Sequence, residues 1–196
     1  AGVTGNVDGL SLERADIKVK RGFISVNQER METSTRNIFA IGDVAGVPCL
    51  AHKASAEGKN VAEIIAGRNS YETRKAAIPT VIFSNPEVAS VGLTEEQAVE
   101  RGGARVGRFP MAANGKAKVI GEPEGFVKTI FCAITGELLG AHMVGFGVTE
   151  LIHGFSLAMT LETTESELME TIFPHPTLSE AMHESVLAAF DGALNA

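Results

Sequence analysis

Short apolar runs alternate with polar stretches through the second half of the chain, a pattern typical of strands. Turn-forming residues bound these runs, which predicts short strands of one sheet. The expected strands are 80–83, 88–92, 104–110, 126–134 and 138–144. Thr135-Gly136 supplies a turn that joins the last two strands as an antiparallel hairpin.

Helical spacing occurs between and after these strands. Two capping-box patterns predict the starts of short helices. They are Thr94-x-x-Gln97 and Thr164-x-x-Glu167. Longer helices are expected over 148–161 and 180–190, each with an apolar stripe. The stripes comprise Leu151, Ile152, Phe155, Ala158 and Met159 in the first, and Met182, Val186, Ala189 and Phe190 in the second. The second half is therefore predicted to have an α+β fold, an antiparallel sheet flanked by helices.

The first half contains fewer regular elements. Residues 1 to about 30 are rich in turn formers, with a short strand expected at 22–26. The apolar run 38–41 predicts a buried strand, and Asp43 follows it closely, where ligands bind in open α/β sheets. A helix is expected over 50–66, and a polar break at 67–75 marks the expected boundary. The predicted inner face of that helix comprises Ala51, Ala54, Gly58, Val61 and Ile65.

Composition narrows the function classes. The 196 residues suffice for one large domain or two small ones, and 44% hydrophobic with 21% charged residues is ordinary for a soluble globular protein. A net charge of −7 without a basic stripe argues against nucleic-acid binding, and no apolar run reaches membrane-spanning length. Cys49 and Cys132 belong to no C-x-x-C pattern, so two buried, reduced thiols in an intracellular protein are expected.

A histidine held between two prolines is the most informative feature near the C-terminus. The prolines keep the backbone around His175 out of a helix, and Glu180 begins the last predicted helix. A rigid loop, a histidine and a carboxylate that can reach back to the imidazole form a candidate general acid/base unit. The same residues permit a structural interpretation, because Thr177-x-x-Glu180 is also a capping box and Ser179 could cap the helix equally well.

One glycine pattern is interpreted as a structural turn. Gly145-Phe146-Gly147-Val148-Thr149-Glu150 follows a predicted strand and opens a helix, as a dinucleotide-binding fingerprint does. Glu150 replaces the third glycine, and its carboxylate would oppose a pyrophosphate at the helix N-terminus.

Four segments, in order along the chain, resemble motifs of the dihydrolipoamide dehydrogenases, which are pyridine nucleotide-disulfide oxidoreductases. N-I-F-A-I-G-D at 37–43 resembles their second FAD motif, and P-C-L-A-H-K-A at 48–54 resembles their flavin-contacting helix start. I-P-T-V-I-F-S-N-P-E-V-A-S-V-G at 78–92 resembles the opening of their interface domain. H-P-T-L-S-E-A at 175–181 resembles their catalytic segment. The chain is thereby identified with the C-terminal portion of this family.

The resemblance implies a role near FAD for each matching residue of the first half. Asp43 would accept hydrogen bonds from the ribityl chain, its alternative being a turn or cap residue. Backbone groups of Cys49, Leu50, Ala51 and His52 would meet the pyrimidine end of the flavin, where a helix N-terminus stabilises negative charge. The side chain of His52 is also consistent with a helix-surface histidine. Cys49 departs from the family's usual Met, which puts an oxidisable thiol near the flavin.

For the acid/base pair, the resemblance implies that His175 takes a proton from a dihydrolipoyl thiol, while Glu180 orients the ring and stabilises the imidazolium. In the family this pair acts across a homodimer, at the partner subunit's flavin and disulfide.

The resemblance also implies a second protein as binding partner, namely a lipoyl-bearing acyltransferase of a 2-oxo acid dehydrogenase complex. Electrons would pass through a disulfide and FAD to NAD. A cytoplasmic location is expected, or the mitochondrial matrix in a eukaryote.

Parts that the family needs are absent from this sequence, namely a C-x4-C segment and two G-x-G-x-x-G fingerprints. Residues 1–76 are therefore expected to be the end of the NAD region and the central segment that completes the FAD site. Residues 77–196 are expected to be the C-terminal dimerisation (interface) domain. We expect this chain alone to be inactive. Two alternatives stay open: another FAD disulfide reductase, such as a glutathione reductase-like enzyme, and a non-catalytic dimerisation module.

Overall fold

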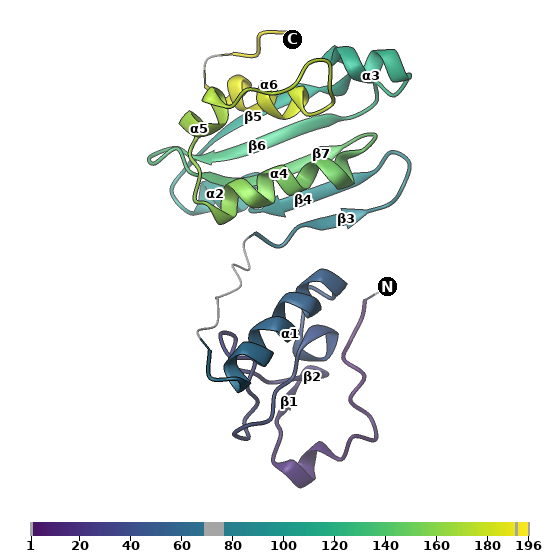
Figure 1. Cartoon of the computed structure of the whole chain (residues 1–196), viewed down its shortest axis with the longest axis vertical. Coiled ribbons are helices and arrows are strands. Elements are labelled where there is room, and N and C mark those ends of the chain that lie inside the picture. The colour runs from purple at the N-terminus through teal and green to yellow at the C-terminus, as the bar shows by residue number, and fades with distance from the viewer. Residues whose placement is uncertain (1, 69–76, 191, 196) are drawn as a thin grey trace. The chain divides into compact units, whose positions relative to one another are not determined.

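The computed structural model describes residues 2–68, 77–190 and 192–195. The chain divides into two compact units, Ala1–Thr73 and Arg74–Ala196, each drawn in Figure 1 and described here by itself. Most of the predicted polar break at 67–75 lies outside the described residues.

The first unit contains little regular structure apart from one long helix. Its elements are η1 (Leu12–Ala15), β1 (Val19–Lys20), β2 (Phe23–Ile24), η2 (Gly42–Ala45) and α1 (Ala51–Ile65). The strands β1 and β2 pair antiparallel, so the predicted strand at 22–26 is confirmed in a shortened form. The predicted helix over 50–66 is α1.

The predicted buried strand at 38–41 is wrong. Only Phe39 takes part in an isolated bridge, to Glu32, and Ile38 and Ile41 are exposed. A strand is stabilised by a ladder of hydrogen bonds to a neighbour, and within this unit the segment makes a single bridge. An apolar run without a sheet to join therefore remains extended and partly open to solvent.

The inner face of α1 also differs from the prediction. Its buried residues are Lys53, Glu57, Asn60 and Val61, whereas Ile65 is exposed. Of the predicted face, only Val61 is buried. The reason is electrostatic: two charged side chains are paired with each other and with the backbone of η2, which makes their burial tolerable.

The second unit has the predicted α+β fold, an antiparallel sheet flanked by helices. Its strands are β3 (Thr80–Ile82), β4 (Val88–Gly92), β5 (Ala104–Pro110), β6 (Phe126–Cys132) and β7 (Leu138–Val144). Its helices are α2 (Glu95–Glu100), η4 (Met111–Ala113), α3 (Gly115–Ile120), α4 (Val148–Thr160), α5 (Glu165–Glu170) and α6 (Glu180–Ala189). Both predicted capping boxes are confirmed, at the starts of α2 and α5. The short helix α3 was not predicted.

The five strands form one antiparallel sheet in the order β3-β4-β7-β6-β5. The hairpin predicted at Thr135-Gly136 joins β6 to β7 and is confirmed. Helix α4 packs on β4 and β7, and α6 packs beside it on β5 and β6 (Figure 1). Helix α2 contacts the opposite face, where Lys128 Nζ lies 3.3 Å from Glu95 Oε2.

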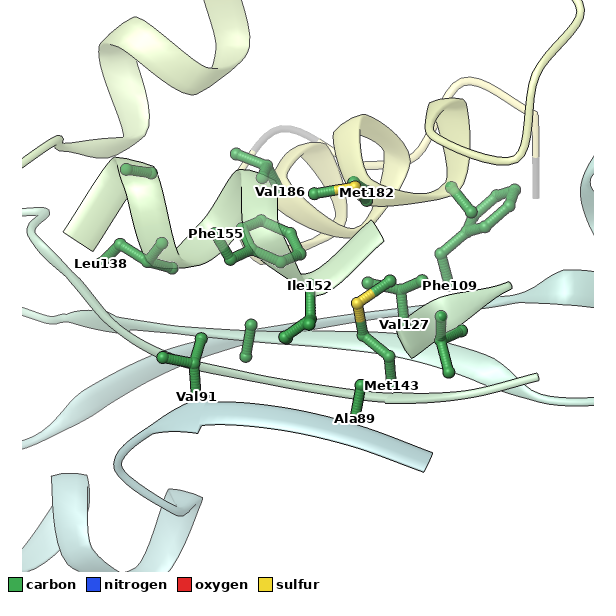
Figure 2. Close-up of a cluster of buried hydrophobic side chains, with 14 of the residues drawn as sticks. Ala89, Val91, Phe109, Val127, Leu138, Met143, Ile152, Phe155, Met182 and Val186 are labelled. Atoms are coloured by element: carbon green, nitrogen blue, oxygen red, sulfur yellow. The ribbon is translucent and has the colours of Figure 1, made fainter. Parts of the chain in front are cut away.

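The core lies between the sheet and the helices α4 and α6. Figure 2 shows Ile152 and Phe155 of α4 and Met182 and Val186 of α6 above strand side chains such as Val127. Each such side chain contributes about 1.5–3 kcal/mol by leaving water. The same core immobilises α6, whose first residue is Glu180.

A glycine allows α6 to lie directly against the sheet. A Cβ atom at Gly107 of β5 would stand 1.9 Å from the carbonyl oxygen of Ser185. That carbonyl also accepts a 2.9 Å hydrogen bond from the buried hydroxyl of Thr129 on β6. Two neighbouring strands therefore set the height of α6 above the sheet, and with it the position of the helix start.

Candidate functional site

The histidine identified from the sequence lies in the connection between α5 and α6. The side chain of His175 is 79% exposed, and its Nδ1 lies 2.8 Å from Oε1 of Glu180. The peptide bond between His175 and Pro176 is cis. The structure thus brings the two predicted catalytic residues together, with the ring edge that carries Nε2 left for another group.

The second carboxylate oxygen of Glu180 binds the backbone of the same loop. Its Oε2 accepts a 2.8 Å hydrogen bond from the Thr177 N–H. This is one half of the predicted capping box; Ser179 occupies the N-cap position, and its side chain makes no cap bond. The Thr177 hydroxyl donates instead to the carbonyl of Pro174 at 2.7 Å. The contact with the imidazole and the contact with the loop backbone are therefore made by different oxygens of one carboxylate.

The hydrogen bonds keep Glu180 ionised. Partial burial is the largest single influence and by itself raises the pKa of Glu180. The Thr177 N–H, the hydrogen bond with His175 and the charge of that ring act in the other direction, and together they hold the pKa below its ordinary value. At neutral pH the side chain is thus a carboxylate that can orient an imidazole.

Two further contacts hold the loop. Asn114, which is buried, donates from Nδ2 to the carbonyl of Thr177 at 3.0 Å and accepts the Ala117 N–H at 2.9 Å, which caps α3. Phe173 stacks on His183 of α6 with ring centroids 5.0 Å apart. The loop is therefore anchored before, within and after the histidine.

A cavity of about 320 Å³ opens beside this pair. It is lined by Phe109, Ala113, Asn114, Gly115, His175, Glu180, Glu184 and Asn195. Glu184 accepts hydrogen bonds from the backbone N–H groups of Leu194 and Asn195 and thereby binds the C-terminal segment at the cavity. A separate, apolar cavity of about 580 Å³ between α4 and α5 contains no predicted site residue.

The predicted flavin-contacting residues all lie in the first unit. Asp43 is exposed in the first turn of η2, and the η2 turn packs against α1. Cys49 and Leu50 are half-buried just before α1, and His52 is exposed in its first turn.

The start of α1 meets a physical requirement for a flavin contact. Leu50 occupies the N-cap position, and its side chain makes no cap hydrogen bond to the first N–H groups of the helix. The first N–H groups of a helix and the helix dipole favour an acceptor or a negative charge at that point. The exposed carboxylate of Asp43 adds an acceptor for hydroxyl groups.

Neither cysteine is as buried as predicted. Both thiols are free and half-buried, because Cys49 precedes α1 and Cys132 ends β6 at the hairpin. Hydrogen bonding by the Thr135 side chain, followed by backbone groups of Thr135 and Ile134, lowers the pKa of the Cys132 thiol.

The helix start within the glycine pattern at 145–150 already binds a carboxylate of the protein itself. Glu87 Oε2 accepts the Thr149 N–H at 3.1 Å and its hydroxyl at 2.7 Å, at the N-terminus of α4. The position of an anion at this helix start is thus filled, which supports the interpretation as a structural turn.

Comparison with protein-family models identifies the family to which the chain belongs. Residues 78–186 match the dimerisation domain of the pyridine nucleotide-disulphide oxidoreductases, and residues 1–58 match the pyridine nucleotide-disulphide oxidoreductase model. The chain belongs to this family, as the sequence resemblance indicated.

Two relatives carry a more specific name within this family, dihydrolipoyl dehydrogenase. The chain is 56% identical over 196 residues to the dihydrolipoyl dehydrogenase of Zymomonas mobilis, covering 99% of this chain and 42% of the relative. It is 40% identical to the mitochondrial dihydrolipoyl dehydrogenase of Pisum sativum over 97% of this chain and 38% of the relative. The chain thus spans about two fifths of the length of these curated relatives.

Solved structures agree on the fold. LpdA from Mycobacterium tuberculosis matches with a TM-score of 0.86 at 30% identity, covering 94% of this chain and 40% of that one. The HOCl-induced flavoprotein disulfide reductase RclA from Escherichia coli also matches with a TM-score of 0.86 at 30% identity, covering 95% of this chain and 43% of that one. No helix in the described parts is both long and apolar enough to cross a membrane.

Sequence reasoning missed three residues that organise the two sites. Asn114 had a detectable signal, since an Asn before a short helical run is a favoured N-cap. Lys53 and Glu57 are spaced i, i+4 on α1, a pattern that ordinarily indicates a solvent-exposed pair. Their burial depends on a turn that only the folded unit brings against them.

Proposed function

We propose that this chain is the C-terminal part of a dihydrolipoyl dehydrogenase, which oxidises dihydrolipoyl groups of 2-oxo acid dehydrogenase complexes. The observation that carries the proposal is the 2.8 Å contact between His175 Nδ1 and Glu180 Oε1, in a chain whose named relatives are dihydrolipoyl dehydrogenases. In this proposal residues 1–76 complete the FAD site, residues 77–196 form the dimerisation domain, and the whole protein is a homodimer.

The contacts of His175 suggest how it handles a proton. When Nδ1–H donates to the Glu180 carboxylate, Nε2 carries the lone pair and can accept a proton. We assign it the proton of a dihydrolipoyl thiol, because only the thiolate attacks a disulfide. Glu180 stabilises the imidazolium that results, as a carboxylate behind a catalytic histidine does.

The oxidation removes two electrons and two protons from the dithiol, which closes to a disulfide. Bound FAD supplies the electron acceptor between the thiols and NAD. NAD would take up both electrons and one proton as a hydride equivalent, and His175 would deliver the other proton to solvent. The residues assigned to the flavin are Asp43 for its hydroxylated chain, and the backbone at Cys49, Leu50, Ala51 and His52 for its ring. Their support is the exposed carboxylate of Asp43 and the start of α1, where the N-cap residue Leu50 makes no side-chain cap bond.

The physiological partner in this proposal is the lipoyl-bearing acyltransferase of such a complex. The location proposed is the cytoplasm, or the mitochondrial matrix in a eukaryote. The names of the bacterial and pea relatives support this assignment.

The test uses the complete protein, purified with its cofactors. We expect NAD reduction by dihydrolipoamide, and a fall in kcat of about 10²–10⁴-fold for His175→Gln, the usual contribution of a general acid/base. Glu180→Gln should lower kcat less than His175→Gln, because the imidazole that accepts the proton is still present. His153→Gln on α4 is the matched control and should be near wild type. Activity with glutathione disulfide alone would support another disulfide reductase, and a complete protein without redox activity would support a dimerisation module.

A further inference from the structure

Helix α1 buries a pair of opposite charges that the proposed chemistry does not use. Lys53 and Glu57 are each 6% exposed, and Lys53 Nζ lies 3.2 Å from Glu57 Oε1. Removing two charges from water costs several kcal/mol for each, and such pairs are frequently no more stabilising than apolar residues of similar size. The pair therefore calls for an explanation beyond stability.

The contacts of the pair point to the η2 turn. Glu57 Oε2 accepts the Gly42 N–H at 2.8 Å. Lys53 Nζ donates to the carbonyl of Gly42 at 3.3 Å and to the carbonyl of Gly46 at 2.9 Å. The three donors of the ammonium thus have three acceptors, namely two backbone carbonyls and Glu57. The pair therefore binds both the N–H and the carbonyl of Gly42. It also binds the carbonyl of Gly46, just beyond the turn.

The fit of the turn against the helix is close. Gly42 has a φ of +70°, and a Cβ atom there would stand 3.1 Å from the Cβ of Ala54. The turn can therefore approach α1 only at a glycine, between Ala54 and the carboxylate of Glu57. The residue that follows is Asp43, which is exposed.

We propose that Lys53 and Glu57 are positioning residues that clamp the η2 turn to α1 and so fix Asp43 relative to the start of that helix. The clamp joins the η2 turn to α1, and both the turn and the start of this helix would have to contact the flavin at the same time. This inference rests on the proposed function for its flavin part, whereas the clamping of the turn is independent of any ligand.

The experiment compares Lys53→Met and Glu57→Gln with Lys59→Met in the complete protein. Lys59 lies exposed on the same helix, so its substitution removes an equal charge without touching the turn. Two quantities are measured: the FAD retained per chain after gel filtration, and the amide hydrogen exchange of residues 42–46 in the protein stripped of FAD. Glu57→Gln is the milder change, since the amide oxygen can still accept the Gly42 N–H, and it serves if Lys53→Met does not fold.

We expect exchange at 42–46 to accelerate at least about tenfold in Lys53→Met and by a smaller factor in Glu57→Gln, with exchange in the second half of α1 unchanged. FAD retention should fall in the same order. Asp43→Ala should lower FAD retention without changing the exchange, and Lys59→Met should change neither. Unaltered exchange in the clamp variants, or full FAD retention despite faster exchange, overturns the inference. A wild-type protein that binds no FAD overturns the proposed function and the flavin part together, and the exchange data then still decide the clamp itself.

Discussion

His175 and Glu180 form a single orienting unit, in which Nδ1 of the histidine lies 2.8 Å from Oε1 of the carboxylate. The other oxygen of Glu180 accepts the Thr177 N–H at the same distance. One carboxylate thus joins the imidazole to the backbone of its own loop. The capping role and the role as partner of the histidine support each other, because the backbone bond prevents the carboxylate from turning away from the ring.

The pKa of Glu180 leads to a prediction about stability and pH. Because the folded pKa lies below its ordinary value of 4.5, the contacts of this carboxylate contribute stability above about that pH. The contribution is lost as the pH falls through the folded pKa. We expect Glu180→Gln to cost about 1 kcal/mol at pH 7 and to make no difference at a pH low enough to protonate the wild-type side chain. Chemical denaturation followed by circular dichroism at several pH values measures this. Glu100→Gln, on α2, is the control, and a Glu180→Gln effect that persists in acid would contradict the prediction.

Asn114 should hold the histidine loop in place. Asn114→Ser keeps an oxygen that can cap α3 but removes the Nδ2 bond to the Thr177 carbonyl. We expect a loss of about 1 kcal/mol and faster hydrogen exchange at the Thr177 N–H. Thr129→Val removes a comparable buried bond, to Ser185, and should cost similar stability without affecting exchange in the loop. Equal exchange in both variants would show that Asn114 acts on stability alone.

The close approach of α6 to the sheet predicts the effect of one methyl group. Gly107→Ala places a Cβ atom where the Ser185 carbonyl lies, so the helix must shift outward. We expect destabilisation of about 1–3 kcal/mol, the usual cost of overpacking. Thermal unfolding of the variant measures this cost. Gly115→Ala, where a Cβ meets no atom within 4 Å, should be neutral or slightly stabilising. An unfolding temperature of Gly107→Ala equal to wild type would mean that α6 has more freedom than this packing implies.

The Cys132 thiol should react with alkylating agents faster near neutral pH than an ordinary exposed thiol, because its pKa is lowered. Thr135→Val removes the largest cause of that lowering, and the pKa should rise towards the ordinary value of 9.0. In a Cys49→Ser background, the pH dependence of iodoacetamide labelling measures the change. Ile134→Ala leaves the Thr135 hydroxyl in place and is the control. A labelling profile that does not move in Thr135→Val would exclude this hydrogen bond as the cause.

Local patterns predicted the second unit well. The hairpin at Thr135-Gly136 and the boxes that begin at Thr94 and Thr164 depend on contacts within a few residues, so the sequence carries them directly. The short spacing from His175 to Glu180 likewise made their contact predictable. The helix α3 escaped prediction because its six residues show no full apolar stripe.

Patterns whose meaning depends on a distant partner were less informative. The run at 38–41 is apolar enough for a strand but makes only one bridge within its unit. The face of α1 was assigned from small and apolar residues, yet the buried residues include the charged Lys53 and Glu57. The burial of these two charges depends on three backbone groups, those of Gly42 and Gly46, and nothing in a helical periodicity reveals such acceptors.

By itself, the sequence determined the order along the chain of the five strands and of the helices α2, α4, α5 and α6 in the second unit. It also determined the histidine loop with its carboxylate, and the resemblance to a family. These follow from hydrophobic periodicity, turn chemistry and residues close together along the chain. The tertiary structure decided which groups are buried, that Asn114 braces the histidine loop, and that a buried ion pair holds the turn carrying Asp43. The physical reason is that a buried polar group is tolerated only where its hydrogen-bonding partners meet it, and only the folded chain brings those partners together.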